Sequence, residues 1–254
     1  MNIQDLIPKW FRGDGVGKAG GRNHLLETGE GDVLYYEQFR ALRSKLEYKA
    51  DTLGWKVVGV TSSVSGEGKT LCSFKVAASL ASTKRKRVLL VDADIRKADL
   101  ARGLGVPIHP GLTEYLRGPL SLKDVTRKTD VAGLFLVPPG TAVSAPADLL
   151  AGERFHVFVA EARKEYDMVL LDTPPVLPVA DTMAMREQVD GYIFIYRAGF
   201  TPFSMFQKAT EEIGEKKILG VVLNGVEPVS EGHYSHYYGQ YYTSAPGREK
   251  GTGG

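Results

Sequence analysis

The sequence predicts an α/β fold, with a doubly wound, mostly parallel sheet that carries helices on both faces. Two observations predict it. Short apolar runs typical of buried strands alternate with longer stretches of helical periodicity along most of the chain. Several of these runs end in aspartate or in a glycine-bearing turn, where α/β proteins place their ligands. The length of 254 residues suits one large domain of this class.

The segment 61–70, Thr-Ser-Ser-Val-Ser-Gly-Glu-Gly-Lys-Thr, is the centre of the functional prediction. It follows an apolar run at 55–60 and precedes an alanine-rich helical stretch at 71–82. Strand, tight loop and helix in this order form a phosphate-binding loop, in which backbone N–H groups and the helix dipole surround an anion. The usual pattern begins with glycine where this chain has Ser63, so an ordinary turn with a capping serine is the alternative. The loop indicates a P-loop NTPase.

The chemistry of such loops assigns roles to single residues. Lys69 can reach the outer phosphates of a nucleotide, and the hydroxyl of Thr70 is placed to bind magnesium. In this segment, the residues expected to bind the nucleotide are Ser65, Gly66, Glu67, Gly68, Lys69, Thr70 and Leu71.

Two apolar runs lead into aspartates. The run 88–91 is followed by Asp92 and Asp94, and the run 168–171 by Asp172. Consecutive apolar residues predict strands buried on both faces of a parallel sheet, whose ligands gather at the carboxyl ends of the strands. Carboxylates at this edge can hold a hydrated magnesium ion or accept a proton from a nucleophile. The alternative is turn chemistry, because aspartate favours the start of a loop.

The remaining core elements follow the same alternation. Strands are predicted at 134–137, 191–196 and 218–223, and a helix at 147–166. The last strand leads to Asn224, whose amide suits the edge of an adenine base.

A helix is also predicted at 34–49, ahead of the phosphate loop. Glu37, Arg40 and Arg43 are spaced three apart and lie on its polar side. By composition alone they form a solvated face, in which a Glu37–Arg40 pair contributes only about 0.2–0.5 kcal/mol. The apolar stripe of this helix consists of Phe39, Leu42 and Leu46.

The two ends of the chain differ from the region between them. Residues 1–30 are rich in glycine and charge and are expected to form a flexible tail, and 227–254 a disordered tail. The second tail holds a cluster of tyrosines, which we interpret as a disordered aromatic segment, a stacking surface for nucleic acid, or a set of phosphate acceptors. A net charge of +2 without a basic stripe argues against nucleic acid. The tyrosines are Tyr234, Tyr237, Tyr238, Tyr241 and Tyr242.

Composition limits the class of protein further. Hydrophobic content of 43% and charged content of 24% are ordinary for a soluble globular protein. The single cysteine, Cys72, excludes an internal disulfide and a cysteine-built metal site. No apolar run approaches the roughly 20 residues that span a bilayer, and no signal peptide is visible. A cytoplasmic protein is therefore expected.

Taken together, these motifs resemble those of the bacterial tyrosine autokinases that regulate capsule and exopolysaccharide export. The loop 61–70 is similar to the family's first phosphate motif, and 91–96 to its additional acidic motif. The segment 171–175 resembles its second acidic strand, and the tyrosine cluster its autophosphorylated tail. The segment 37–43 is similar to the E-x-x-R-x-x-R segment through which these kinases assemble rings. One departure is Ser65, where the family usually has proline.

The resemblance implies a kinase domain at 31–226, with ATP as phosphoryl donor and Mg²⁺ as cofactor. It implies catalytic roles for Lys69 and for Asp92 as the base, with Asp94 as the alternative base. Magnesium would be held by Thr70, Asp94 and Asp172. The ring would form through Glu37, Arg40 and Arg43, and the tail tyrosines of one subunit would be phosphorylated by its neighbour.

The resemblance also implies partners. The chain is similar to the free-standing form of the family, which relies on a transmembrane activator of the polysaccharide chain-length class and is recruited by it to the inner face of the plasma membrane. A phosphotyrosine phosphatase would reverse the modification, and no nucleic acid is expected. The alternative is a positioning ATPase of the partition or division-site type, but those carry a signature lysine where this chain has Val64. A nucleotide-binding scaffold without transfer is a third interpretation.

Overall fold

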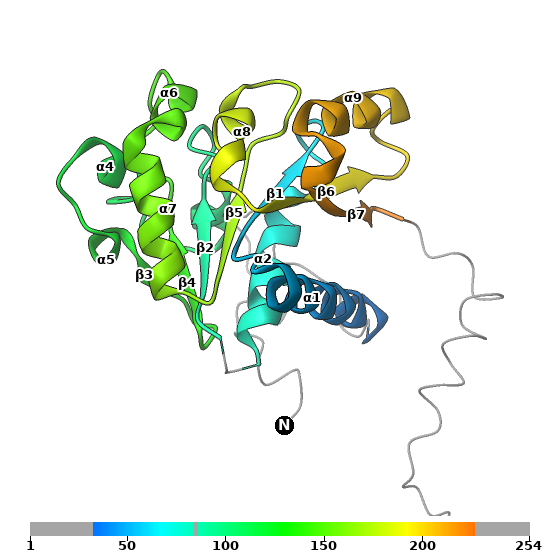
Figure 1. Ribbon diagram of the computed structural model, residues 1–254, viewed down its shortest axis with the longest axis horizontal. Helices are drawn as coiled ribbons and strands as arrows, with labels where there is room; N and C mark the ends of the chain where they lie inside the picture. The colour runs from blue at the N-terminus through cyan, green and yellow to red at the C-terminus, as the bar shows by residue number, and fades with distance from the viewer. Residues whose placement is uncertain (1–32, 84–85, 227–254) are drawn as a thin grey trace, which may run out of the picture. The chain divides into compact units, whose positions relative to one another are not determined.

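The computed structural model describes residues 33–83 and 86–226 (Figure 1). The tails expected at 1–30 and 227–254, with all five tail tyrosines, lie outside the described residues. Within them, the chain forms a seven-stranded sheet of order β3-β4-β2-β5-β1-β6-β7. All neighbouring strands are parallel except β3, which is antiparallel to β4.

The strands are β1 (Val57–Ser62), β2 (Val88–Asp92), β3 (Arg127–Lys128), β4 (Leu134–Val137), β5 (Met168–Asp172), β6 (Gly191–Arg197) and β7 (Ile218–Asn224). The α-helices are α1 (Val33–Leu53), α2 (Lys69–Ala81), α3 (Asp99–Gly103), α4 (Leu112–Arg117), α5 (Leu122–Val125), α6 (Pro146–Ala151), α7 (Glu153–Glu165), α8 (Asp181–Ala184) and α9 (Phe203–Ile213). Two short 3-10 helices, η3 (Arg186–Gln188) and η4 (Glu215–Lys217), precede β6 and β7.

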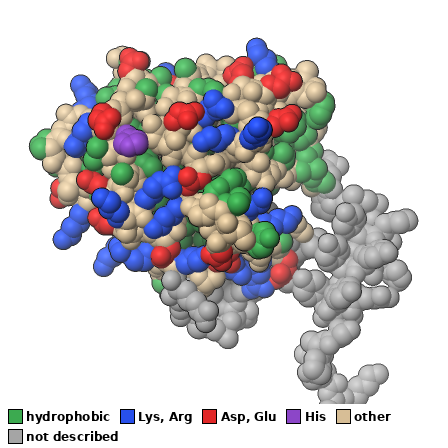
Figure 2. All heavy atoms as spheres, viewed as in Figure 1, with side chains coloured by type: hydrophobic (Ala, Val, Ile, Leu, Met, Phe, Trp, Pro, Cys, Tyr) green, Lys and Arg blue, Asp and Glu red, His purple; other side chains and the backbone are tan. Residues whose placement is uncertain are grey.

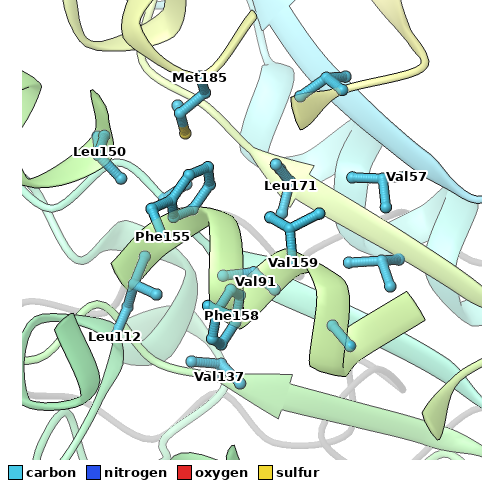
Figure 3. Packing of buried hydrophobic residues seen from close by; sticks show 14 of the residues in the cluster. Val57, Val91, Leu112, Val137, Leu150, Phe155, Phe158, Val159, Leu171 and Met185 are labelled. Atoms are coloured by element: carbon cyan, nitrogen blue, oxygen red, sulfur yellow. The ribbon is translucent and has the colours of Figure 1, made fainter. Parts of the chain in front are cut away.

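Two apolar cores, one on each face of the sheet, hold the layers together. Alternate residues of the strands point to opposite faces, so Val57 and Leu171 join one core while Val58 and Leu170 join the other. The first core packs under α4, α5, α7 and α9, and the second under α1, α2 and α3. Figure 3 shows Phe155 and Phe158 of α7 lying against the sheet in the first core. The predicted doubly wound sheet with helices on both faces is therefore confirmed.

Most predicted elements occur close to their expected bounds. The six predicted strands are β1, β2 and β4 to β7, and β2 and β5 are buried along their whole length. The single helix predicted at 147–166 is wrong, because Gly152 adopts an extended backbone (φ −73°, ψ 158°) that ends α6 and starts α7. The two-residue strand β3 was not predicted. Among the described helices, none combines the length and the apolar character needed to cross a membrane.

The register of the central strands brings the acidic positions level with one another. Asp92 at the end of β2 is paired with Asp172 at the end of β5, and Asp172 is paired in turn with Val60 of β1. The loop after β1 therefore leaves the sheet at the same edge as the two aspartates. This edge is the candidate site.

We predict that Phe155→Ala lowers the free energy of unfolding by about 3–5 kcal/mol, because it leaves a cavity in a fully buried cluster. Urea denaturation measures the change. Phe203→Ala is the matched control, since Phe203 is 61% exposed and should lose no more than about 1 kcal/mol. Equal losses at the two positions would contradict the packing described here.

Candidate phosphate-binding and acidic site

The phosphate loop runs from the end of β1 at Ser62 to the start of α2 at Lys69. Gly66 and Gly68 have positive φ values of 90° and 92°, a region that residues with a side chain rarely adopt. A Cβ built on Gly68 would also collide with the amide nitrogen of Asn224. No side chain caps the start of α2, so its first N–H groups are available to an anion. The loop thus has the form of an anion cradle.

The side chain of Glu67 does not face outward. It is fully buried, and its carboxylate accepts hydrogen bonds from the Val64 N–H at 2.8 Å, the Thr201 hydroxyl at 2.6 Å and the Arg197 N–H at 3.2 Å. Glu67 therefore ties the phosphate loop to the turn between β6 and α9. Sequence reasoning placed Glu67 in the nucleotide site without this structural role, which depends on residues about 130 positions away.

Asn224 lies at the end of β7 and contacts the same loop. Its Nδ2 donates a hydrogen bond to the Glu67 carbonyl at 2.7 Å. The amide thus lies against the phosphate loop, a contact that was not predicted, while its contact with adenine stays a prediction. Leu71 lies half-buried in the first turn of α2, and Ser65 lies exposed in the loop.

Lys69 and Asp94 form a buried ion pair. The distance from Lys69 Nζ to Asp94 Oδ2 is 3.3 Å, and both side chains are less than a tenth exposed. Burial by itself lowers the pKa of Lys69, but the charges of Asp172 and Asp94 together raise it above its ordinary value. The lysine therefore carries its charge at neutral pH. The structure brings together the lysine and the acidic strand ends that the sequence predicted.

Asp92 and Asp172 are buried carboxylates that keep unused oxygens. Oδ1 of each has no hydrogen-bond partner among the described residues, and Asp92 Oδ2 receives only a long bond of 3.4 Å from the Ala101 N–H. Burial, followed by the charges of Asp172 and Asp94, raises the pKa of Asp92 well above its usual range. Burial also raises the pKa of Asp172 to about 6, although the charge of Lys69 opposes this shift.

The donor set fits a magnesium ion. It offers the Thr70 hydroxyl and carboxylate oxygens, the hard ligands that Mg²⁺ prefers, and a cation would compensate carboxylates that Lys69 alone does not balance. Among residues 33–83 and 86–226, no group of three or more His, Cys, Asp or Glu side chains forms a complete metal centre. An ion here would therefore take further ligands from phosphate and water oxygens.

Glu37, Arg40 and Arg43 of α1 do not share one set of contacts. Glu37 and Arg40 form an ion pair with each other. Arg43 instead faces α2, where its Nη1 donates to the Ser79 carbonyl at 3.1 Å and to the Ser82 hydroxyl at 3.4 Å. Arg43 therefore fastens α1 to α2, a role that its spacing in the sequence did not indicate.

Comparisons with known proteins define first the class and then the family. A family model described as an AAA domain matches residues 55–197. Tyrosine-protein kinase YwqD of Bacillus subtilis (strain 168) is 31% identical, over 85% of this chain and 91% of its own length. The BceF tyrosine kinase domain superposes with a TM-score of 0.69 at 31% identity, over 76% of this chain and 78% of its own. The chain is a P-loop protein, and it belongs to the family of bacterial tyrosine-protein kinases.

Two further comparisons mark the limits of this likeness. The putative tyrosine-protein kinase EpsB of Ralstonia nicotianae is 33% identical over 89% of this chain, which spans only 31% of that relative. The septum site-determining protein MinD of Pyrococcus horikoshii, complexed with Mg-ADP, has a TM-score of 0.55 at 22% identity over 66% of this chain and 69% of its own. The second likeness shows the shared fold alone.

We predict that Asp172→Asn changes how stability depends on pH in the protein free of nucleotide and metal. A folded-state pKa of about 6, above the ordinary value, means that Asp172 favours folding most at low pH and loses this contribution as pH rises through about 6. The free energy of unfolding of the variant, relative to that of the wild type, should therefore rise by on the order of 1–3 kcal/mol between about pH 4 and pH 6.5. Urea denaturation across this range measures the gain, and parallel pH profiles would contradict it.

Proposed function

We propose that this protein is an ATP-dependent protein-tyrosine autokinase that phosphorylates its own tyrosine cluster, from subunit to subunit within a ring, and so regulates polysaccharide polymerisation and export. The observation that carries the proposal is the buried Lys69–Asp94 pair, with Asp92 and Asp172 beside it, at the mouth of an anion cradle. Family membership supplies the acceptor chemistry, since the relatives are named tyrosine-protein kinases.

The loop binds and orients the phosphates of ATP. Backbone N–H groups from Gly66 to Thr70 surround them, and Lys69 contacts the outer ones. Ser65 and Leu71 border this cradle, and Asn224 contacts the adenine. Phosphoryl transfer needs alignment and charge neutralisation more than covalent help, so a rigid loop is the main requirement. The buried carboxylate of Glu67 provides that rigidity.

Asp92 acts as the base, with Asp94 as the alternative. The tyrosine oxygen bonds to the γ-phosphorus of ATP, the bond from that phosphorus to the β,γ-bridging oxygen breaks, the hydroxyl proton passes to Asp92, and ADP leaves. A carboxylate with a raised pKa is a stronger base toward a tyrosine, whose own pKa is near 10. Asp94 is less suited because its carboxylate is already paired with Lys69.

Magnesium would be held by Thr70, Asp94 and, through water, Asp172. When bound, the ion neutralises charge on the β- and γ-phosphates. The Oδ1 atom of Asp172, which has no hydrogen-bond partner among the described residues, supports this assignment.

Assembly links this chemistry to regulation. A ring formed through Glu37, Arg40 and Arg43 would present the tail of one subunit to the loop of the next. Each phosphotyrosine adds about −1.5 to −2 charge, which would repel neighbouring tails and loosen the ring. A transmembrane activator of the polysaccharide chain-length class would recruit the protein from the cytoplasm to the membrane, and a phosphotyrosine phosphatase would reset it. On the face shown in Figure 2, acidic side chains lie among the basic ones, which supports the expectation that nucleic acid is not a partner.

The positioning ATPases are the second candidate, because they share the fold. Val64 occupies the position of their signature lysine. The identity to named tyrosine kinases favours the first candidate.

We predict that purified protein incubated with labelled ATP and magnesium becomes labelled on tyrosine, and that Lys69→Met abolishes the label. Asp92→Asn should reduce labelling at least about 100-fold while Mg-ADP still binds, because a base acts on transfer rather than on nucleotide affinity. Phosphotyrosine detection and calorimetric titration measure the two effects. The experiment is run with and without the cytoplasmic segment of a candidate activator. Absence of tyrosine label in both conditions would refute the kinase proposal.

We predict that Arg40→Ala dissolves the ring without unfolding the protein, because among the described residues the Arg40 side chain makes only a surface pair with Glu37, worth about 0–1 kcal/mol. Arg43→Ala should weaken the ring and, in addition, lower the free energy of unfolding by about 1–2 kcal/mol through its lost bonds to α2. Sedimentation velocity reports the first effect and urea denaturation the second. Lys45→Ala, on the exposed side of α1, is the control. A sedimentation profile that Arg40→Ala leaves unchanged would exclude this helix as the ring contact.

A further inference from the structure

Lys97 lies in the turn between β2 and α3, three residues beyond Asp94, and reaches across to the phosphate loop. Its Nζ donates a hydrogen bond to the Ser65 hydroxyl at 2.6 Å. Its backbone is fixed on both sides, because its N–H donates to the Asp94 carbonyl at 3.0 Å and its carbonyl accepts from Arg102 Nη1 at 2.8 Å. The side chain itself is exposed. Lys97 thus has a backbone fixed by hydrogen bonds and a side chain whose ammonium group contacts the phosphate loop.

The backbone beside Lys97 is strained. Ala98 has φ 54° and ψ 32°, and among the described residues it is the only one other than glycine with a positive φ. For a residue with a side chain this conformation costs on the order of 1 kcal/mol and persists only where the surroundings impose it. Such strain is concentrated at functional sites. Here it lies between the acidic strand end and α3, next to the lysine that contacts the loop.

The other cations at this edge are already committed. Lys69 is paired with Asp94 at 3.3 Å, and Arg96 binds Asp181 through two hydrogen bonds of 2.8 and 3.1 Å. Arg197 donates to the Gly66 carbonyl at 2.9 Å. Lys97, in contrast, has no carboxylate within ion-pair distance among the described residues, and its partner is a neutral hydroxyl.

A phosphate oxygen would displace that hydroxyl. The Lys97–Ser65 hydrogen bond is already assisted by the charge of the lysine, and a phosphate oxygen would add direct attraction between opposite charges. The segment 61–70 contains a single cation of its own, Lys69, and Val64 beside Ser65 is apolar. A second positive charge at the loop must therefore come from another part of the chain, and Lys97 supplies one.

We propose that Lys97 is a further catalytic residue, which binds the terminal phosphoryl group of the nucleoside triphosphate and stabilises the charge that develops on it during transfer. The proposal rests on the phosphoryl-transfer function inferred above. In such reactions charge spreads over the three peripheral oxygens of the transferred group, and a positioned cation lowers the barrier. Lys69 and Lys97 would then share this charge, one from α2 and the other from the turn after β2.

The test compares Lys97→Met and Lys97→Arg with the wild type, with Lys164→Met as a charge-matched control on the exposed end of α7. Calorimetric titration measures the affinity for Mg-ADP and for a non-hydrolysable ATP analogue, and tyrosine labelling measures kcat. Lys97→Met should lose about 10-fold more affinity for the analogue than for ADP, the loss of one charge-assisted contact. Its kcat should fall about 100-fold. Lys97→Arg should recover part of both losses, and Lys164→Met should change neither.

Ser65→Ala distinguishes a contact of Lys97 with phosphate from a purely structural role, in which Lys97 only holds the loop in place through Ser65. It removes the hydroxyl but keeps the cation, so its preference for the analogue over ADP should stay as in the wild type. Equal losses of ADP and analogue affinity in Lys97→Met, or no loss at all, would overturn the proposal. Circular dichroism and urea denaturation exclude misfolding as the cause. If the wild type shows no tyrosine label while Lys97→Met still loses the preference for the analogue, the kinase proposal fails and the γ-phosphate contact stands.

Discussion

The attraction between Lys69 and the carboxylates around it is the interaction on which the rest of the site depends. Three aspartates meet one lysine at the ends of buried strands, where water is largely excluded. Burial raises the pKa of Asp92 and of Asp172, which is the physical sign that negative charge is held there against its preference for solvent. Without the lysine, these carboxylates would have to take up protons or separate. With it, they remain close together at one edge of the sheet.

The sheet provides the geometry that this charge cluster needs. Because β2 and β5 are parallel and adjacent, the pairing of Asp92 with Asp172 is fixed by backbone hydrogen bonds rather than by the side chains themselves. The two apolar cores then cover both faces of the strands and keep water away from their ends. The order of the strands places the phosphate loop after β1 next to β5. The site thus results from a topology whose stability comes from apolar packing, and the charged groups are held in place by it.

Sequence patterns predicted what depends on neighbours along the chain. The strands, the phosphate loop and the acidic strand ends follow from local runs and spacings, so they were placed correctly. What they missed depends on tertiary contacts. Glu67 was predicted to bind the nucleotide and Arg43 to lie on a polar helix face, but the Glu67 carboxylate accepts a hydrogen bond from Thr201 and Arg43 donates to α2. No role was predicted for Lys97, because only the fold shows that it reaches Ser65. The break at Gly152 had a local signal, the glycine itself, that helical periodicity on both sides obscured.

The arrangement of charge also explains why the nucleotide and a cation should bind together. The loop would offer N–H groups and Lys69 to the phosphates, whereas the strand ends would offer Asp92 and Asp172, whose Oδ1 atoms have no hydrogen-bond partner among the described residues. A triphosphate alone would bring its negative charge toward those carboxylates, and a divalent ion alone would lack the phosphate oxygens that complete its coordination. Each ligand would therefore raise the affinity of the site for the other, which corresponds to a negative coupling free energy between them. If both ligands bind the folded state, they would also offset the free-energy cost of burying these carboxylates.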